Sequence, residues 1–291
     1  MKINTVSIVG CGWFGLPLAK LLVKQGYQVS GSKRDKEAAN KLKKEGIQGF
    51  SLDLDHHKFN GQCVETDKLF QNGVELTSEL ESEFKASLHT HALVINIPPS
   101  LRKQPNGYLK RLVYLKSLMA DHVYQRVIFI STSGVYPATG QSMTEGDAVA
   151  HSPSSNILLQ AESLFLQDYP TCVLRFSGLM GPARHPGRFL AGKTGLPGAD
   201  APVNLVHLDD CIGAVSCLLS KEPLSPIYNL CASAHPGRSD FYSQAAKCLS
   251  LVAPTFGEEV QVAKIIDGSK ITKELGFNYR HNSPLDMLDK C

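Results

Sequence analysis

The sequence VSIVGCGWFGLPLAKLL, residues 6–22, sets three glycines between a short apolar run and a pattern of apolar residues at helical spacing. Gly10, Gly12 and Gly15 form the spacing G-x-G-x-x-G. Between a strand and a helix, such glycines let the backbone turn tightly and approach a pyrophosphate, and the helix N-terminus supplies N–H donors and partial positive charge. This stretch therefore predicts a dinucleotide site, with a plain structural turn as the alternative.

Apolar bursts alternate with helical patterns as far as Phe176, which is typical of βαβ units on a parallel sheet. The pattern predicts a Rossmann-type, doubly wound α/β fold. The expected strands are residues 5–9, 28–32, 49–52, 92–97, 127–131 and 172–176.

Beyond Phe176 the alternation stops, and a stretch rich in glycine and proline, residues 177–202, follows. Its length of roughly 26 residues favours a lid or binding segment over an ordinary surface loop. We expect a strand at 204–206, a helix at 209–219 and a strand at 227–230 to return to the sheet. The tail then predicts a helix with one apolar side, made of Phe241, Ala245, Cys248 and Leu249.

The composition is that of an ordinary globular protein, with 43% hydrophobic and 20% charged residues. A formal net charge of +3 is too small to indicate nucleic acid or an anionic membrane as a partner. No apolar stretch approaches the roughly 20 residues that span a bilayer. The eight cysteines include no C-x-x-C pair and lie mostly in apolar runs. We therefore expect reduced cysteines and a cytoplasmic protein.

The end of the second strand indicates which dinucleotide is preferred. Enzymes that hold a ribose 2′-hydroxyl usually place Asp or Glu there, whereas this chain has Ser32, Lys33 and Arg34 and no acid before Asp35. The two cations could hold a 2′-phosphate, which predicts NADP, with NAD as the alternative. A solvated basic helix start would explain the same residues. Asp53, which ends the third strand, would face the adenine or serve only as a turn residue.

Four segments together resemble a known family: the glycine turn, VIFISTSGVYP (127–137), LRFSGLMGP (174–182) and VNLVHLDD (203–210). They are similar to the epimerase/dehydratase branch of the extended short-chain dehydrogenase/reductase superfamily. The resemblance implies a Rossmann domain at 1–176, joined by 204–230, and a small C-terminal substrate domain at 177–203 and 231–291. Dimers are common in that superfamily, and a homodimer is expected here by analogy only.

In that family the nucleotide lies across the carboxyl ends of the strands. Besides Gly10, Gly12, Gly15, Ser32, Lys33, Arg34 and Asp53, the resemblance therefore implies cofactor contacts from the residues that follow the strands. These are Trp13, Phe14, Leu54, Ile97, Pro98, Pro99, Ser131 and Ser177.

The sequence departs from the family in two places. Most members of the branch space their glycines as G-x-x-G-x-x-G, but Val9 stands where the first would be, which resembles the atypical subgroup. The family also uses a Ser or Thr after the fifth strand, and a Tyr followed four residues later by a Lys that lowers the tyrosine pKa. Thr132 fills the first place, but Ser154 and Leu158 occupy the other two.

The candidates for catalysis are therefore Thr132 and Tyr136, although a packed aromatic residue behind the site is the favoured interpretation of Tyr136. His185 and Arg188 in the long loop could reach an anionic substrate, or could be solvated loop residues. No metal is expected, since neither His56–His57 nor His89–His91 has a converging spacing.

Two functions stay open at this point. One is an NADP(H)-binding reductase or epimerase-like enzyme that acts on a small polar or sugar-like substrate. The other is a dinucleotide-binding sensor or regulatory protein without turnover. The absent tyrosine and lysine favour the sensor, whereas Thr132 and an apparent substrate domain favour the enzyme.

Overall fold

The computed structural model describes residues 2–56, 58–59, 62–63, 82–83, 86–101, 107–119, 122–223 and 225–291. The chain forms two compact units, each described here by itself. Unit 1 comprises residues 1–130, 157–173 and 218–222. Unit 2 comprises residues 131–156, 174–217 and 223–291.

In the described part of the chain, nine strands form one sheet in the order β12-β9-β7-β6-β1-β2-β3-β4-β5. The bounds of the first five are β1 (Thr5–Val9), β2 (Gln28–Lys33), β3 (Gln48–Asp53), β4 (Lys58–Phe59) and β5 (Gln62–Cys63). The others are β6 (Ala92–Ile95), β7 (Arg126–Thr132), β9 (Thr171–Phe176) and β12 (Ile227–Leu230). Only β4 and β5, at one edge, are shown to pair in the antiparallel sense.

The strand β1 pairs with β2 on one side and with β6 on the other, both in parallel. The chain order therefore reverses between β1 and β6. In open α/β sheets, ligands bind beyond the carboxyl ends of the strands at such a switch point. The fold places the glycine turn that follows β1 at this position.

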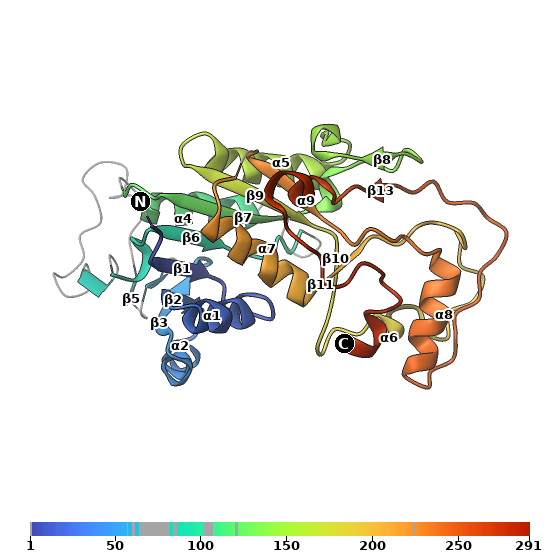
Figure 1. The fold of residues 1–291 in the computed structure, drawn as a ribbon, viewed down its shortest axis with the longest axis horizontal. Helices are drawn as coiled ribbons and strands as arrows, with labels where there is room; N and C mark the ends of the chain where they lie inside the picture. Colours follow the sequence, from blue (N-terminus) through green and yellow to red (C-terminus); the bar gives the residue numbers. More distant parts are fainter. Residues whose placement is uncertain are drawn as a thin grey trace. The chain divides into compact units, whose positions relative to one another are not determined.

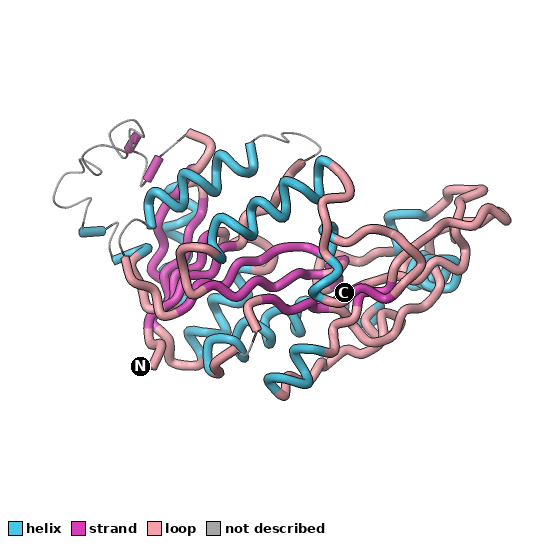
Figure 2. Tube along the Cα trace, turned by 90° about the horizontal axis from the view of Figure 1, so that it is seen from above, coloured by secondary structure: helices cyan, strands magenta, loops and turns pink. Residues whose placement is uncertain are grey.

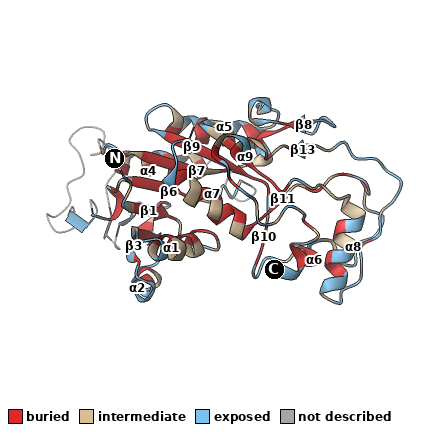
Figure 3. Ribbon diagram, in the orientation of Figure 1, coloured by how far each residue is buried: buried red, intermediate tan, exposed pale blue. Residues whose placement is uncertain are grey.

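The helices of the sheet have bounds α1 (Gly15–Lys24), α2 (Lys36–Lys41), α4 (Gly107–Met119), α5 (Pro153–Leu166) and α7 (Leu208–Ser220). Figure 1 shows α1 and α2 together below the strands, and Figure 2 shows the strands between helices on both sides. Strands covered on both faces read as continuous apolar runs, and β6 is buried at all four positions. The exposed outer side of α2 contrasts with the buried strands in Figure 3.

The expected fold is confirmed. Strands 5–9 and 227–230 have the predicted bounds, and the other expected strands differ by one or two residues at their ends. On α4, Tyr108, Leu112, Leu115 and Met119 are all buried.

Unit 2 contains the short parallel pairs β10 (Gly178–Met180) with β11 (Leu205–His207) and β8 (Ser142–Met143) with β13 (Ile265–Ile266). Its remaining helices are α6 (Gly187–Leu190), α8 (Arg238–Cys248) and α9 (Lys270–Leu275). It also holds three 3-10 turns, η2 (Ser133–Val135), η3 (Glu145–Asp147) and η4 (Leu288–Lys290), and unit 1 holds η1 (Leu42–Glu45). A core of unit 2 joins Met180, Val203, Phe241, Ala245 and Met287.

Three expectations for this region need correction. The strand expected at 204–206 was predicted to return to the main sheet, but β11 pairs with β10 in a separate two-stranded sheet. The stretch 177–202 contains a strand and a helical turn, because β10 pairs with β11, which follows it in sequence. The tail helix buries Phe241 and Ala245, but Cys248 is exposed and Leu249 lies just beyond the helix end. Four residues after Ala245 the chain has already left the helix, so the apolar side is shorter than predicted.

The seven cysteines whose side chains the structure describes are free thiols, and four of them, Cys11, Cys172, Cys211 and Cys231, are buried. Small apolar thiols in a core are consistent with the expected packing role. Among the described residues, none of the helices combines the length and the apolar character that crossing a bilayer requires.

Candidate functional site

Unit 1 holds a cavity of about 230 Å³ at the carboxyl ends of β1, β2, β3 and β6. The turns that follow β1 and β6 form two of its walls, and helix α4 contributes one side chain. The lining residues are Val9, Gly10, Cys11, Gly12, Ser32, Lys33, Arg34, Leu52, Leu54, Asp55, Asn96, Ile97, Pro98 and Arg111.

The glycine turn is held tightly against β6 and β2. Gly10 has φ +102°, and a Cβ built there would lie 2.1 Å from the backbone oxygen of Asn96. The Gly10 N–H donates to Ser32 Oγ at 2.9 Å, and Asn96 Nδ2 donates to the Gly10 oxygen at 3.0 Å. A side chain at Gly15 would collide with the Gly10 oxygen. These two glycines are therefore required by the fold itself.

Gly12 has a different role. It is exposed, and a Cβ added there would meet no atom within 4 Å. A side chain would therefore fit at position 12, but the residue is glycine, and its backbone lines the cavity. Helix α1 begins with Phe14 at the N-cap, which gives no side-chain cap, and no acidic residue follows in its first turn. An uncapped helix start beside open backbone suits an anionic ligand.

The cavity is rich in cations. Lys33 and Arg34 line it from the end of β2, and Arg111 reaches it from α4. Arg111 is only 5% exposed; it donates to Asp55 Oδ1 at 3.2 Å and to the backbone oxygens of Pro98 and Pro99 at 3.4 and 3.3 Å. Among the described residues its buried Nε has no hydrogen-bond partner.

Asp55 is the one carboxylate among these lining residues. Its Oδ2 lies 3.8 Å from Arg34 NH1, while its Oδ1 accepts from Arg111. Three cations therefore face one carboxylate. This charge balance, together with the unsatisfied Arg111 Nε, fits a phosphate-bearing ligand.

Eight of the predicted cofactor residues line this cavity: Gly10, Gly12, Ser32, Lys33, Arg34, Leu54, Ile97 and Pro98. Trp13, Phe14, Gly15, Asp53 and Pro99 belong to the same unit but are not among its lining residues. Ser131 and Ser177 belong to unit 2 and are buried there.

Asp53 caps its own turn instead of facing the cavity. Its Oδ1 accepts from the backbone N–H groups of Asp55 and His56, and its Oδ2 lies 2.8 Å from His56 Nδ1. Asp53 is therefore a turn residue, which was the alternative to an adenine contact. Asp55, two residues later, lines the cavity instead.

Sequence reasoning missed Asn96, Asp55 and Arg111. Arg111 stands in an amphipathic helix, where an arginine ordinarily indicates a solvated face, and only its burial reveals the contact. Asn96 lies within the strand expected at 92–97 but follows the observed β6, so a polar residue directly after the apolar run was an available signal. Cys11 also lines the cavity, but burial raises the pKa of its thiol to about 12, so it stays protonated.

Thr132 and Tyr136 flank the 3-10 turn η2 in unit 2. Thr132 Oγ1 accepts from the Gly134 N–H at 3.3 Å. The Tyr136 ring is fully buried; its hydroxyl donates to Asn229 Oδ1 at 2.6 Å and accepts from Arg175 NH1 at 2.7 Å. Burial raises the pKa of the Tyr136 hydroxyl, although Arg175 opposes that shift. The hydroxyl therefore both donates and accepts a hydrogen bond inside the protein.

Replacing Tyr136 by Phe should destabilise the fold by about 1–3 kcal/mol, because the buried groups of Asn229 and Arg175 lose their partner. Urea unfolding followed by circular dichroism measures the change. The half-buried Tyr27→Phe is a matched control expected within about 0.5 kcal/mol of the parent. Unchanged stability with lost turnover would instead identify Tyr136 as a proton carrier.

Ser154 and Leu158, which the resemblance aligned with a Tyr and a Lys, lie on α5, where Ser154 is exposed and Leu158 is buried. A lysine from elsewhere in the chain, Lys264, reaches the turn η2. Lys264 Nζ donates to the backbone oxygen of Ser133 at 3.1 Å and also to that of Tyr136. Burial lowers the pKa of Lys264. The linear sequence carries no signal for this contact, because 131 residues separate the two partners.

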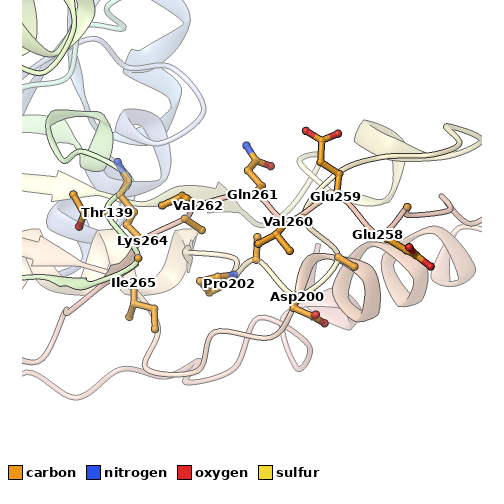
Figure 4. Close-up of a pocket in the computed structure, with 16 residues that line it drawn as sticks. Thr139, Asp200, Pro202, Glu258, Glu259, Val260, Gln261, Val262, Lys264 and Ile265 are labelled. Atoms are coloured by element: carbon orange, nitrogen blue, oxygen red, sulfur yellow. The ribbon is translucent and has the colours of Figure 1, made fainter.

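Unit 2 contains a cavity of about 710 Å³ (Figure 4). Its walls come from the segments 139–140, 198–202 and 257–265. Figure 4 shows Glu259 and Gln261 projecting side by side from the last of these segments. The polar lining side chains are Thr139, Asp200, Glu258, Glu259, Gln261 and Lys264.

The two predicted substrate residues are not among the lining residues of this cavity. His185 Nδ1 accepts from the Gly187 N–H at 3.0 Å, and burial, followed by the charge of Arg188, lowers the pKa of its imidazole. Arg188 is exposed on α6. Only the end of the long loop, from Gly198 onward, reaches the cavity wall.

Comparison with known proteins identifies the relatives of this chain. Protein YeeZ of Escherichia coli, in strains K12 and O157:H7, is 37% identical over 289 residues, which cover 97% of this chain and 98% of YeeZ. The chain belongs to the YeeZ family. Similarity at this level over the full length of both chains implies that the YeeZ family shares the fold described above.

The family model for the NAD binding domain of 6-phosphogluconate dehydrogenase matches residues 5–97, from β1 to the turn after β6. This is the part of unit 1 that carries the glycine turn and the cations of β2. This chain therefore has a Rossmann-type α/β fold whose first part matches an NAD-binding domain.

Solved structures share the fold at low identity. UDP-glucuronic acid 4-epimerase from Bacillus cereus, in complex with UDP-glucuronic acid and NAD, is 18% identical with a TM-score of 0.70, over 98% of this chain and 97% of its own. The enzyme WbmG of Bordetella bronchiseptica, in complex with NAD, is 12% identical with a TM-score of 0.72, over 100% and 93%. The YeeZ family thus has the architecture of these NAD-binding enzymes.

Proposed function

We propose that this protein is an NADP(H)-dependent oxidoreductase or epimerase-like enzyme of the atypical extended short-chain dehydrogenase/reductase group. Its substrate would be a small polar, sugar-like molecule with a carbonyl or a secondary hydroxyl. The observation that carries the proposal is the cavity in unit 1. It is lined by the exposed backbone of Gly12 and by three cationic side chains, and the buried Nε of Arg111 has no hydrogen-bond acceptor among the described residues.

In this proposal, Gly10 and Gly12 receive the pyrophosphate, and Lys33 with Arg34 hold the 2′-phosphate. Bound NADP(H) would supply or accept a hydride at its nicotinamide ring. Arg111 is already oriented by Asp55 and by the oxygens of Pro98 and Pro99, so little side-chain entropy remains to be lost on binding.

The cavity of unit 2 is proposed as the substrate site. Its volume lies in the range of about 300–1,000 Å³ that is common for small-molecule sites. Its carboxylates and the amide of Gln261 could hydrogen-bond the hydroxyls of a polyol or sugar. Thr132 would hydrogen-bond the reacting oxygen, and Lys264, by holding the backbone of η2, would position it.

Transfer of deuterium from stereospecifically 4-deuterated NADPH tests this function. Incubation with a panel of sugar-like carbonyl compounds should place label in one product, detected by mass spectrometry. Thr132→Ala should lower kcat by about 10²-fold, because a hydrogen bond to the reacting oxygen is lost, with the NADPH Kd unchanged. Thr132→Ser, which keeps the hydroxyl, is the matched control.

A second candidate function is a dinucleotide sensor without turnover. The observation that favours it is the exposed Ser154 and buried Leu158 at the positions where the family has its proton-transfer pair. Tight NADPH binding without label transfer to any compound of the panel would support the sensor and contradict the enzyme.

A further inference from the structure

Two imidazoles and one carboxylate converge in unit 2, outside both cavities described above. His207 ends β11, Asp209 lies in the first turn of α7, and His281 comes from the C-terminal segment. Among the described residues, these three side chains bring one ligand atom each within 4.8 Å of one another. The fold therefore brings His281 to the two donors of the motif VHLDD, from which it is remote in the chain. The proposed function uses none of these three side chains.

Hydrogen bonds determine the tautomer of His207. Its Nδ1 accepts from the backbone N–H of Asp209 at 3.2 Å, so this nitrogen carries no proton. Its Nε2 lies 3.3 Å from the backbone oxygen of Lys290, which can only accept, so Nε2 carries the proton. A neutral histidine whose single ring N–H donates to a backbone carbonyl, which leaves the lone pair on the other ring nitrogen, is typical of metal ligands.

His281 is held in place by the neighbouring Asp210. The Asp210 carboxylate is almost fully buried and accepts from the backbone N–H groups of Arg280 at 2.6 Å and His281 at 3.2 Å. This anchor brings the His281 ring to the start of α7, with its centroid 4.1 Å from that of His207. His281 is thus positioned by a backbone contact that does not use its ring nitrogens. Its Nε2 lies 3.4 Å from Asp209 Oδ2, and His207 Nδ1 accepts from the Asp209 N–H, so both nitrogens face the same residue.

The two distances from the Asp209 carboxylate to the imidazole nitrogens fit a small divalent ion. Asp209 Oδ2 lies 3.5 Å from His207 Nδ1 and 3.4 Å from His281 Nε2. With metal–ligand bonds of about 2.0–2.1 Å in a tetrahedron, donor atoms are about 3.3 Å apart. The side chain of His207 is 2% exposed and that of His281 15%, whereas Asp209 is 45% exposed. Solvent therefore has access from one side only.

We propose that His207, Asp209 and His281 form a binding site for one divalent transition-metal ion of the Zn²⁺ class. Two neutral imidazoles and one carboxylate suit Zn²⁺, Co²⁺ or Ni²⁺ rather than Mg²⁺ or Ca²⁺, which prefer oxygen donors. Metal binding replaces the hydrogen bond from the Asp209 N–H and leaves a coordination position for water on the exposed side. The ion ties the C-terminal segment to the start of α7 and is independent of the proposed function.

Isothermal titration of the full-length, untagged, chelator-treated protein with ZnCl₂ and with CoCl₂ tests the site. A Cys248→Ser background removes an exposed thiol that could bind these ions on its own. One Zn²⁺ should bind per chain, and the thermal unfolding midpoint should rise by several degrees. His281→Gln and Asp209→Asn, which alter partly exposed side chains, should each weaken Zn²⁺ binding at least tenfold and abolish the rise.

His151 is exposed, and its Nδ1 lies 3.1 Å from the backbone oxygen of Val149 in the same loop. The variant His151→Gln is therefore the control, and it should leave Zn²⁺ binding unchanged. Absence of Zn²⁺ binding, Zn²⁺ affinity equal to that of the parent in both ligand variants, or preference for Mg²⁺ over Zn²⁺ would each overturn the proposal. A variant that fails to fold is recognised by circular dichroism, and the other ligand variant then decides.

Discussion

Changing Lys33 and Arg34 together to alanine should raise the Kd for NADPH by tens-fold and leave the Kd for NADH within a few-fold of the parent. Each charge-assisted hydrogen bond to a 2′-phosphate contributes roughly 1.5–3 kcal/mol. The Arg34 side chain is 70% exposed, so solvent reduces its share and places the effect near the lower end of that range. Quenching of Trp13, the single tryptophan, measures both constants.

Lys43→Ala with Lys44→Ala is the matched control, since it removes the same charge from exposed positions of η1 that do not line the cavity. The control should retain the preference for NADPH. Equal affinities for NADPH and NADH in the parent protein would refute the assignment of the β2 cations to a 2′-phosphate. No quenching by either nucleotide would remove both proposed functions.

Alanine at Gly10 and at Gly12 should produce opposite defects. Gly10→Ala should cost roughly 2–5 kcal/mol of stability, because φ +102° is strained for a side chain and the Cβ would lie 2.1 Å from the Asn96 oxygen. Gly12→Ala should fold normally, since its Cβ meets nothing within 4 Å, yet it should weaken NADPH binding at least tenfold. Urea unfolding measures the first effect and Trp13 quenching the second.

Gly140→Ala provides a reference for backbone strain alone, since Gly140 has φ +79° and also meets nothing within 4 Å. Its stability should lie between that of the parent and that of Gly10→Ala. If Gly12→Ala bound NADPH as tightly as the parent, the open space at Gly12 would not be the place of the pyrophosphate.

The agreement between sequence and structure is closest where the signal is local. The run of residues 6–22 covers most of β1, the glycine turn and most of α1, and Gly10 and Gly15 stand where the fold needs a glycine. The expectation for Cys248 failed because a helical pattern does not reveal where a helix ends. Lys33 and Arg34 were predicted as site residues and line the cavity, but Asp55, which also lines it, was not predicted, since a carboxylate in a turn has no periodicity to mark it.

By itself, the sequence determined the class of fold, the glycine turn and the cations beside it, because apolar periodicity and turn chemistry act over a few neighbouring residues. Only the tertiary structure decided that Arg111 meets Asp55, that Lys264 holds the turn at Ser133, and that His281 approaches His207. These pairs are brought together by packing and sheet topology across 56 residues or more, and no local propensity encodes such contacts.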